Sequence, residues 1–118
     1  MALGDYNPET AIEAFKRAEY EAVFAYCLPH ADGGNTSAQC MVSLLYQSGL
    51  GVGRDFRKAE EWLMKAVGQN DALAWNNLAT LYASGGEGLS KGPESARECY
   101  LQAKELGFSC GEPYPPGG

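Results

Sequence analysis

Apolar residues recur at helical spacing along most of the chain, and turns rich in Gly, Asn or Asp interrupt them at regular intervals. Spacings of three, four and seven residues between apolar positions are typical of an amphipathic helix with one buried face. The pattern predicts helices at about residues 8–18, 20–32, 37–48, 56–67, 72–84 and 93–106. No segment alternates convincingly with the period of two that a strand requires. The chain is therefore predicted to be all-α, with three antiparallel helix pairs.

Residues that start and stop helices mark several of these boundaries. Asn7 and Asp55 precede predicted helices, where a side-chain oxygen can accept a hydrogen bond from a free backbone N–H of the first turn. The glycine-rich segment 49–53 follows a predicted helix and provides the left-handed conformations that end many helices. Pro29 lies inside the second predicted helix and should kink that helix or end it early.

A stretch in the middle of the chain returns later in similar form. Residues 38–46 (Ala-Gln-Cys-Met-Val-Ser-Leu-Leu-Tyr) correspond to residues 74–82 (Ala-Trp-Asn-Asn-Leu-Ala-Thr-Leu-Tyr). Each copy is followed by a glycine-rich turn and a second amphipathic segment. Self-similarity at this period is typical of arrays in which each unit buries its apolar face against its neighbour. The sequence therefore predicts a stack of helical repeats.

The charge balance disfavours nucleic acids and anionic membranes as partners. Nine Lys and Arg stand against 15 Asp and Glu, and no basic cluster interrupts this balance, whereas binding phosphates requires concentrated positive charge. No apolar run approaches the roughly 20 residues that span a bilayer. No signal peptide is visible, so we expect a cytoplasmic protein; an exported protein whose signal peptide had been removed would have the same sequence.

Four cysteines, at positions 27, 40, 99 and 110, lack the spacing of a disulfide framework. We expect thiols that act as small apolar residues. Cys27 and Cys40 lie at similar distances from the Gly33–Gly34 turn, so a disulfide between them in an oxidising compartment stays open. Cys27, His30 and Cys40 offer three soft ligands where zinc normally takes four, so no metal site is predicted.

The sequence contains little that supports catalysis. It has one His and no Gly-x-Ser-x-Gly motif. Segment 49–53 joins two helices and lacks the Lys-Ser/Thr ending of a phosphate-binding loop, which favours a structural turn. The glutamates, among them Glu9, Glu60, Glu61 and Glu98, are expected on the solvent side of the helices. We therefore predict no catalytic residue and no cofactor.

The repeat resembles the Sel1-like repeats, which are close relatives of the tetratricopeptide repeat. In the first copy the resemblance rests on Ala38, Val42, Tyr46, Gly49, Gly51, Val52, Asp55, Lys58, Ala59, Trp62, Ala66 and Val67. In the second it rests on Ala74, Leu78, Ala79, Tyr82, Gly85, Gly88, Leu89, Ala96 and Ala103. The second copy departs from the pattern at Gly92, Ser95 and Cys99, where the family has Asp, Lys and Trp.

The resemblance implies a short right-handed α-solenoid over residues 1–108. It divides this domain into a degenerate leading repeat at 9–35, a repeat at 36–71 and a terminal repeat at 72–108. Residues 109–118 are left as a Pro/Gly-rich tail, which we expect to be extended or mobile.

The resemblance also implies a non-enzymatic adaptor or scaffold, of bacterial type, that binds a protein or peptide. In such stacks the front helices line a concave groove. The positions that the resemblance assigns to this groove are Ser37, Met41, Leu44, Gln47, Asn76, Asn77 and Thr80. Met41 and Leu44 would be apolar anchors, and the two Asn side chains would hydrogen-bond a peptide backbone. Core packing of Met41 and Leu44 stays an alternative.

Two other functions stay open. Some cysteine-rich bacterial Sel1-like proteins are linked to β-lactam binding or hydrolysis, although this chain lacks their regularly spaced cysteine pairs. A self-assembling structural subunit is the other, in which exposed Trp75, Tyr100 or Phe108 at an uncapped end would stack on a second copy. We expect a monomer or a weak dimer.

Overall fold

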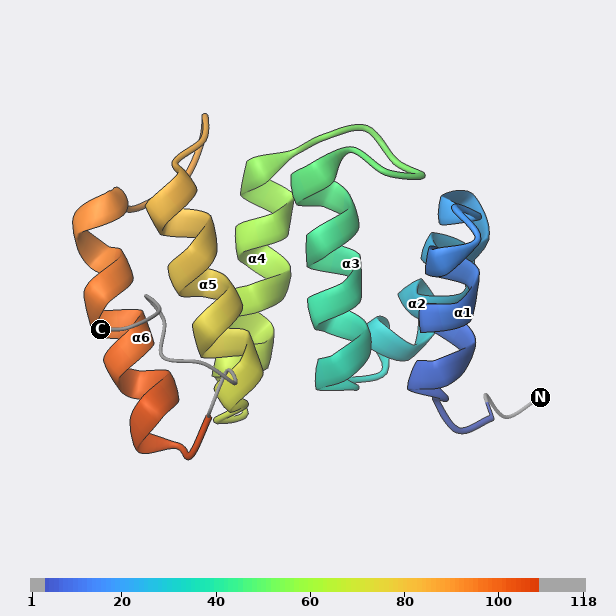
Figure 1. The fold of residues 1–118 in the computed structure, drawn as a ribbon, viewed down its shortest axis with the longest axis horizontal. Coiled ribbons are helices and arrows are strands. Elements are labelled where there is room, and N and C mark those ends of the chain that lie inside the picture. The colour runs from blue at the N-terminus through green and yellow to red at the C-terminus, as the bar shows by residue number, and fades with distance from the viewer. Residues whose placement is uncertain (1–3, 109–118) are drawn as a thin grey trace.

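The computed structural model describes residues 4–108, and the predicted tail at 109–118 lies outside them (Figure 1). The α-helices in this range are α1 (Pro8–Lys16), α2 (Tyr20–Asp32), α3 (Thr36–Ser48), α4 (Phe56–Val67), α5 (Ala72–Ser84) and α6 (Ala96–Glu105), which a short 3-10 helix, η1 (Pro93–Ser95), precedes. No strand occurs among the described residues, so the all-α prediction is confirmed. The helices pack in consecutive pairs to form a solenoid (Figure 1). None of them is long and apolar enough to cross a membrane.

Polar residues fix where most of the helices begin. A side-chain oxygen accepts a backbone N–H bond from the first turn at four helix starts, namely at Asn7, Asn35, Asp55 and Asp71. These bonds satisfy donors that have no partner within the helix. The capping predicted for Asn7 and Asp55 is confirmed.

Helix α2 continues through Pro29 to Asp32, so the early end that we allowed for at this proline is wrong. A proline removes one backbone donor, but Pro29 lies in the last turn, where few further helical bonds depend on it. The proline carbonyl accepts a bond from Gly33 N at 3.0 Å, and the His30 carbonyl accepts one from Asn35 N at 3.0 Å. These two bonds complete the end of the helix.

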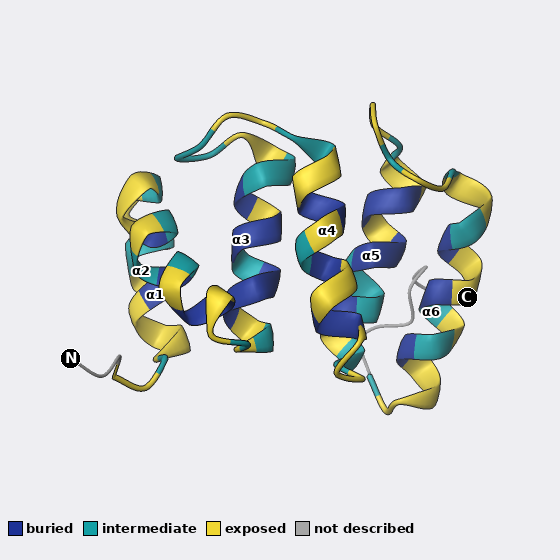
Figure 2. Cartoon of the chain, turned by 180° about the vertical axis from the view of Figure 1, so that it is seen from behind, coloured by how far each residue is buried: buried dark blue, intermediate teal, exposed yellow. Residues whose placement is uncertain are grey.

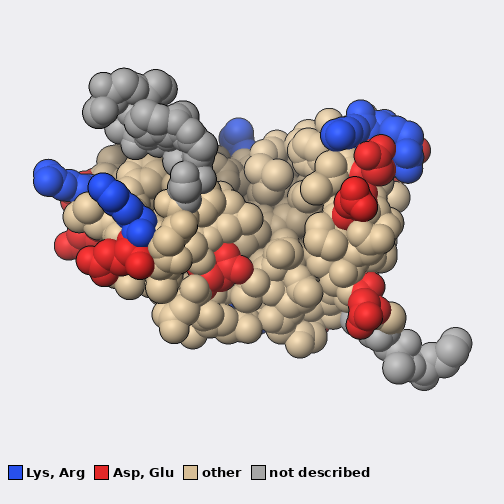
Figure 3. Space-filling model, turned by 60° about the horizontal axis from the view of Figure 1, so that its bottom comes forward, with Lys and Arg blue, Asp and Glu red and all other residues tan. Residues whose placement is uncertain are grey.

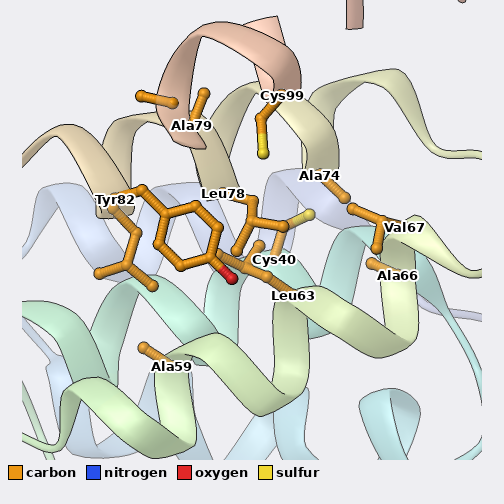
Figure 4. Close-up of a cluster of buried hydrophobic side chains, with 12 residues drawn as sticks. Cys40, Ala59, Leu63, Ala66, Val67, Ala74, Leu78, Ala79, Tyr82 and Cys99 are labelled. Carbon is orange, nitrogen blue, oxygen red and sulfur yellow. The ribbon is translucent and has the colours of Figure 1, made fainter. Parts of the chain in front are cut away.

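The core consists of two apolar clusters. The N-terminal cluster joins α1, α2 and α3 and includes Val23, Val42 and Leu45. The C-terminal cluster joins α4, α5 and α6 (Figure 4), and Cys40 of α3 extends into it. Buried residues follow the inner faces of the helices (Figure 2), and many of them are alanines, which let the helix backbones approach closely. Tyr46 packs against both clusters.

The turn between α3 and α4 lies against the start of α2. A Cβ on Gly51 would lie 2.5 Å from the carbonyl carbon and oxygen of Tyr20, and Gly51 has a φ of +76°. Both facts require glycine, because other residues rarely adopt this φ and a Cβ would overlap the backbone. Leu50 and Val52 on either side pack against the N-terminal cluster. The glycine-rich segment 49–53 is therefore a packed structural turn.

Glu60 is buried, which contradicts the prediction that the glutamates occupy the solvent side. Its carboxylate accepts hydrogen bonds from the Tyr82 hydroxyl at 2.5 Å, from Ser90 N at 3.0 Å and from the Ser90 hydroxyl. Burial by itself would raise the pKa of Glu60, but these bonds outweigh it and lower the pKa below the ordinary value of 4.5. The carboxylate thereby holds the loop between α5 and α6 against α4. Glu9, Glu61 and Glu98 are exposed, as expected.

Candidate functional site

A cavity of about 380 Å³ opens along the first helices of the three pairs, α1, α3 and α5, which we call the front helices. We call this cavity the groove. Its lining residues are Tyr6, Pro8, Ile12, Ser37, Cys40, Met41, Ser43, Leu44, Gln47, Leu73, Asn77 and Thr80. None of them is acidic or basic. Figure 3 shows this face, on which most of the charged side chains gather toward the two ends and one acidic group lies nearer the middle.

The two complete repeats contribute the same positions to the groove. Three pairs of lining residues are 36 positions apart, which is the spacing of the repeat: Ser37 and Leu73, Met41 and Asn77, and Leu44 and Thr80. Within each helix these positions follow the spacing of four and three residues that lies along one helical face. The groove is therefore built from one face of each front helix.

All the sequence-predicted groove residues line this cavity except Asn76. Leu44 is 39% exposed, whereas Met41 is half-buried and packs against the N-terminal cluster while it also lines the groove. Asn76 corresponds to Cys40 in the first repeat, and Cys40 packs into the cluster of the following helix pair. Asn76 is half-buried and does not line the cavity, although its counterpart Cys40 does.

The contribution of the N-terminal segment was missed at the level of sequence. Tyr6, Pro8 and Ile12 close one side of the groove. Tyr6 and Pro8 precede the predicted leading repeat at 9–35 and Ile12 lies within it, and no motif identifies groove positions in this part of the chain. Ile12 is 43% exposed, but from the sequence its helical spacing placed it with the apolar positions of the first predicted helix.

Contacts with α2 fix the segment that precedes α1. Asn7 N donates a hydrogen bond to the Tyr26 hydroxyl at 2.9 Å, and the Tyr6 hydroxyl lies 3.5 Å from Cys27 Sγ. The Tyr6 ring stacks on Tyr26 and meets the buried His30 edge-on, with centroids 5.6 and 5.2 Å apart. These contacts hold Tyr6 at the edge of the groove, and burial raises the pKa of its hydroxyl.

The cysteine chemistry of the site is that of neutral thiols. Burial, together with the charge of Asp71, raises the pKa of the Cys40 thiol to about 12, although a hydrogen bond with Asn77 opposes this change. A protonated thiol is a poor nucleophile. Cys27, Cys40 and Cys99 are all free, so the disulfide left open above is not formed, and Cys110 lies outside the described range. Within residues 4–108 no group of three His, Cys, Asp or Glu could hold a metal ion.

A second cavity of about 420 Å³ lies between α5 and α6. Its lining includes Trp75, Lys91, Cys99 and Gln102. The buried Trp75 Nε1 has no hydrogen-bond partner. Trp75, Tyr100 and Phe108 are half-buried, which contradicts the expectation that they are exposed for stacking on a second copy.

Comparison with known proteins gives a consistent result. A family model described as Sel1 repeat matches residues 36–71 and 72–108; the leading repeat at 9–35 stays a prediction. A Sel1 repeat protein from Oxalobacter formigenes is 32% identical, with a TM-score of 0.73 over 89% of this chain and 41% of its own. A protective antigen from uropathogenic Escherichia coli, described as displaying an SLR fold, is 20% identical, with a TM-score of 0.69. This match covers 92% of this chain and 25% of the antigen's chain. This chain therefore spans less than half of either structure. A search of curated proteins gave no match.

Proposed function

Because this chain belongs to the Sel1 repeat family, we propose that it is an interaction scaffold whose groove binds a peptide segment of a protein partner. Helical solenoids of this family are typically non-enzymatic. The proposal therefore assigns the activity to binding along the front helices and to no chemical step. The chain covers only part of the structures that it resembles, so the proposal concerns this helical stack.

One observation carries the proposal. Among the described residues, half of the large apolar side chains that are exposed converge on the groove: Ile12, Leu44 and Leu73, at 43%, 39% and 43% exposed. Each comes from a different front helix. Exposed apolar side chains gathered in one concavity are typical of interaction sites, whereas single ones scattered over a surface need no explanation.

The lining also indicates what kind of segment fits. The apolar residues would contact two or three apolar side chains of the partner. Ser37, Gln47, Asn77 and Thr80 provide hydroxyl and amide groups that can bond to a peptide backbone. Since no lining residue is charged, the part of the partner that enters the groove is uncharged.

Capture from a native lysate tests the proposal, with the parent chain compared with the double variant Met41→Glu/Asn77→Ala. We expect partners held by the parent to be lost by this variant, because a charge in the apolar wall has no counter-charge in the groove. Met64→Glu is the matched control, since Met64 is 51% exposed on α4 and does not line the groove. Circular dichroism must show that both variants are folded. A partner that the groove variant holds as well as the parent would place binding elsewhere.

The two other functions gain no support from the site. The Cys40 thiol is neutral and buried, which disfavours a nucleophilic role in hydrolysis. The aromatic side chains expected to drive self-assembly are half-buried, and Trp75 and Tyr100 pack against the C-terminal cluster. We therefore carry only the binding function forward.

A further inference from the structure

Carboxylates border one end of the groove. The front helices run in the same direction, so their amino-terminal ends lie on the same side of the molecule (Figure 1). At this end Asp5 and Glu9 are exposed beside the lining residues Tyr6 and Pro8. Asp71 is the capping residue of α5 and lies two positions before Leu73. Its negative charge contributes to the raised pKa of the Cys40 thiol in the groove wall.

Among the described residues, no salt bridge joins a basic side chain to Asp5, Glu9 or Asp71. Within residues 4–108 the salt bridges join Lys16 to Glu13 at 4.0 Å and Arg17 to Glu19 at 3.4 Å, at the other end of α1. The cations nearest the groove along the chain are thus already paired. The Asp71 carboxylate accepts bonds from Ala74 N at 3.0 Å and from the Thr36 hydroxyl at 2.6 Å, which hold it in place without cancelling its charge.

The helix dipoles do not reverse this charge. Each helix amino terminus is equivalent to about half a positive charge, so three front helices contribute roughly +1.5. The three carboxylates exceed this sum, and the end of the groove is negative. The middle of the groove is different, since neither Thr36–Ser48 nor Ala72–Ser84 contains an acidic or basic residue.

We propose that the peptide segment bound in the groove is apolar and uncharged over most of its length and carries Lys or Arg at the end that lies beside Asp5, Glu9 and Asp71. This inference rests on the function proposed above and names the class of partner for the same site. Attraction between exposed charges adds little affinity, but a charge at one end favours one orientation of the segment over the reverse. The acidic end therefore determines the direction in which the partner lies.

A random 12-residue peptide library displayed on phage, selected against the full chain, provides the probes. We expect the enriched peptides to combine two or three large apolar residues with Lys or Arg toward one end. Synthetic copies of these peptides are then titrated into the parent chain and into Met41→Glu/Asn77→Ala. Binding that survives the second variant does not involve the groove.

Charge reversal then tests the acidic end. In Asp5→Lys/Glu9→Lys we expect the affinity for the selected peptides to fall about threefold to tenfold at low salt, with the difference largely removed at roughly 1 M salt, where exposed charges are screened. The matched control is Glu61→Lys/Glu98→Lys, which changes the net charge by the same amount on exposed positions of α4 and α6. We expect this control to bind as the parent does.

The outcomes separate the two proposals. Groove-dependent peptides that lack basic residues, or that bind equally well after charge reversal, overturn the inference and leave the binding function standing. Equal weakening by both double variants also overturns the inference, because it shows a response to net charge only. A selection that yields no groove-dependent peptide overturns the proposed function and the inference together.

Discussion

At the scale of single residues, Glu60 shows how a charge stabilises this fold from inside. The carboxylate is 6% exposed and accepts bonds from one residue of α5 and one of the following loop. Its removal would leave the buried Tyr82 hydroxyl without its acceptor, which is the costly way to lose a hydrogen bond, and would also release Ser90 N. No spacing in the sequence could reveal this role, because Glu60 and Ser90 are 30 positions apart and the loop alone brings them together.

We predict that Glu60→Gln lowers the free energy of unfolding at pH 7 by about 1–3 kcal/mol, because the bonds to a charged acceptor are replaced by weaker ones. The folded-state pKa of Glu60 lies below 4.5, so its contribution is complete above about pH 4.5 and is lost as the pH falls through the folded pKa. Urea unfolding from pH 7 to pH 3 measures both effects. The gap between parent and variant should narrow in acid, and a constant gap would contradict this account. Glu61→Gln, an exposed neighbour, is the control and should match the parent.

At the scale of elements, the packed turn 49–53 explains why glycines that resemble a phosphate-binding loop serve packing here. Gly51 permits the turn to touch the α2 backbone at Tyr20, so the second helix pair is fitted onto the first through a main-chain contact. The helices themselves could be predicted from sequence, since periodicity and capping are local properties. The contact of this turn with α2 could not, because it depends on how two pairs stack.

Gly51→Ala should therefore lower the free energy of unfolding by about 2–3 kcal/mol, since it combines an unfavourable φ with overlap against backbone. Gly53→Ala is the matched control in the same turn, because a Cβ there meets nothing within 4 Å. Chemical denaturation of the two variants and the parent measures the difference. Equal stabilities for the two alanine variants would show that the turn can move away from Tyr20 without a loss in the free energy of unfolding.

The two repeats also differ in which helix supplies a large ring. The first repeat has Gln39 on its front helix and Trp62 on its back helix, whereas the second has Trp75 and Cys99 at the corresponding positions. Trp75 and Cys99 line the same cavity, so in the second repeat the large aromatic ring at this place is that of Trp75, on the front helix. Aligning the repeats identifies the absence of Trp at position 99, but which neighbour occupies the space follows only from the packed structure.

At the scale of the whole molecule, Tyr46 connects the two apolar clusters. Its ring meets Phe24 edge-on at 5.5 Å, and Lys58 Nζ lies 6.0 Å above it. A stack of repeats unfolds as one unit only when the contacts between neighbours are strong enough. Tyr46 is therefore placed to couple the folding of the first helix pair to that of the others.

Tyr46→Ala should lower the free energy of unfolding by about 2–4 kcal/mol and weaken the coupling between the clusters. We expect the unfolding midpoints from far-UV circular dichroism and from Trp fluorescence, which coincide in a two-state parent, to separate in this variant. Tyr20→Ala, which removes a half-buried ring from the N-terminal cluster only, is the comparison and should retain coincident midpoints. Coincident midpoints in Tyr46→Ala would show that other contacts couple the clusters.

Much of the groove could be predicted from the repeat register, which assigned its positions on α3 and α5. Its boundaries could not. Ile12 was missed because the leading repeat has no motif, and Asn76, which the register assigned to the groove, is not among the residues that line the cavity. The repeat register predicts which face of a front helix points toward the groove. The neighbouring elements determine whether a residue on that face lines the groove.

The recurrence of groove positions at the repeat spacing has a consequence for how such a protein changes over time. Ser37, Leu44, Leu73 and Thr80 are exposed, while the residues that hold the helices together are buried elsewhere on the same helices. Substitutions at exposed positions usually alter stability by no more than about 0.5 kcal/mol. Selection for folding therefore hardly limits which residues can occupy these groove positions. A lineage can acquire a new partner one helix pair at a time, while the scaffold beneath it stays the same.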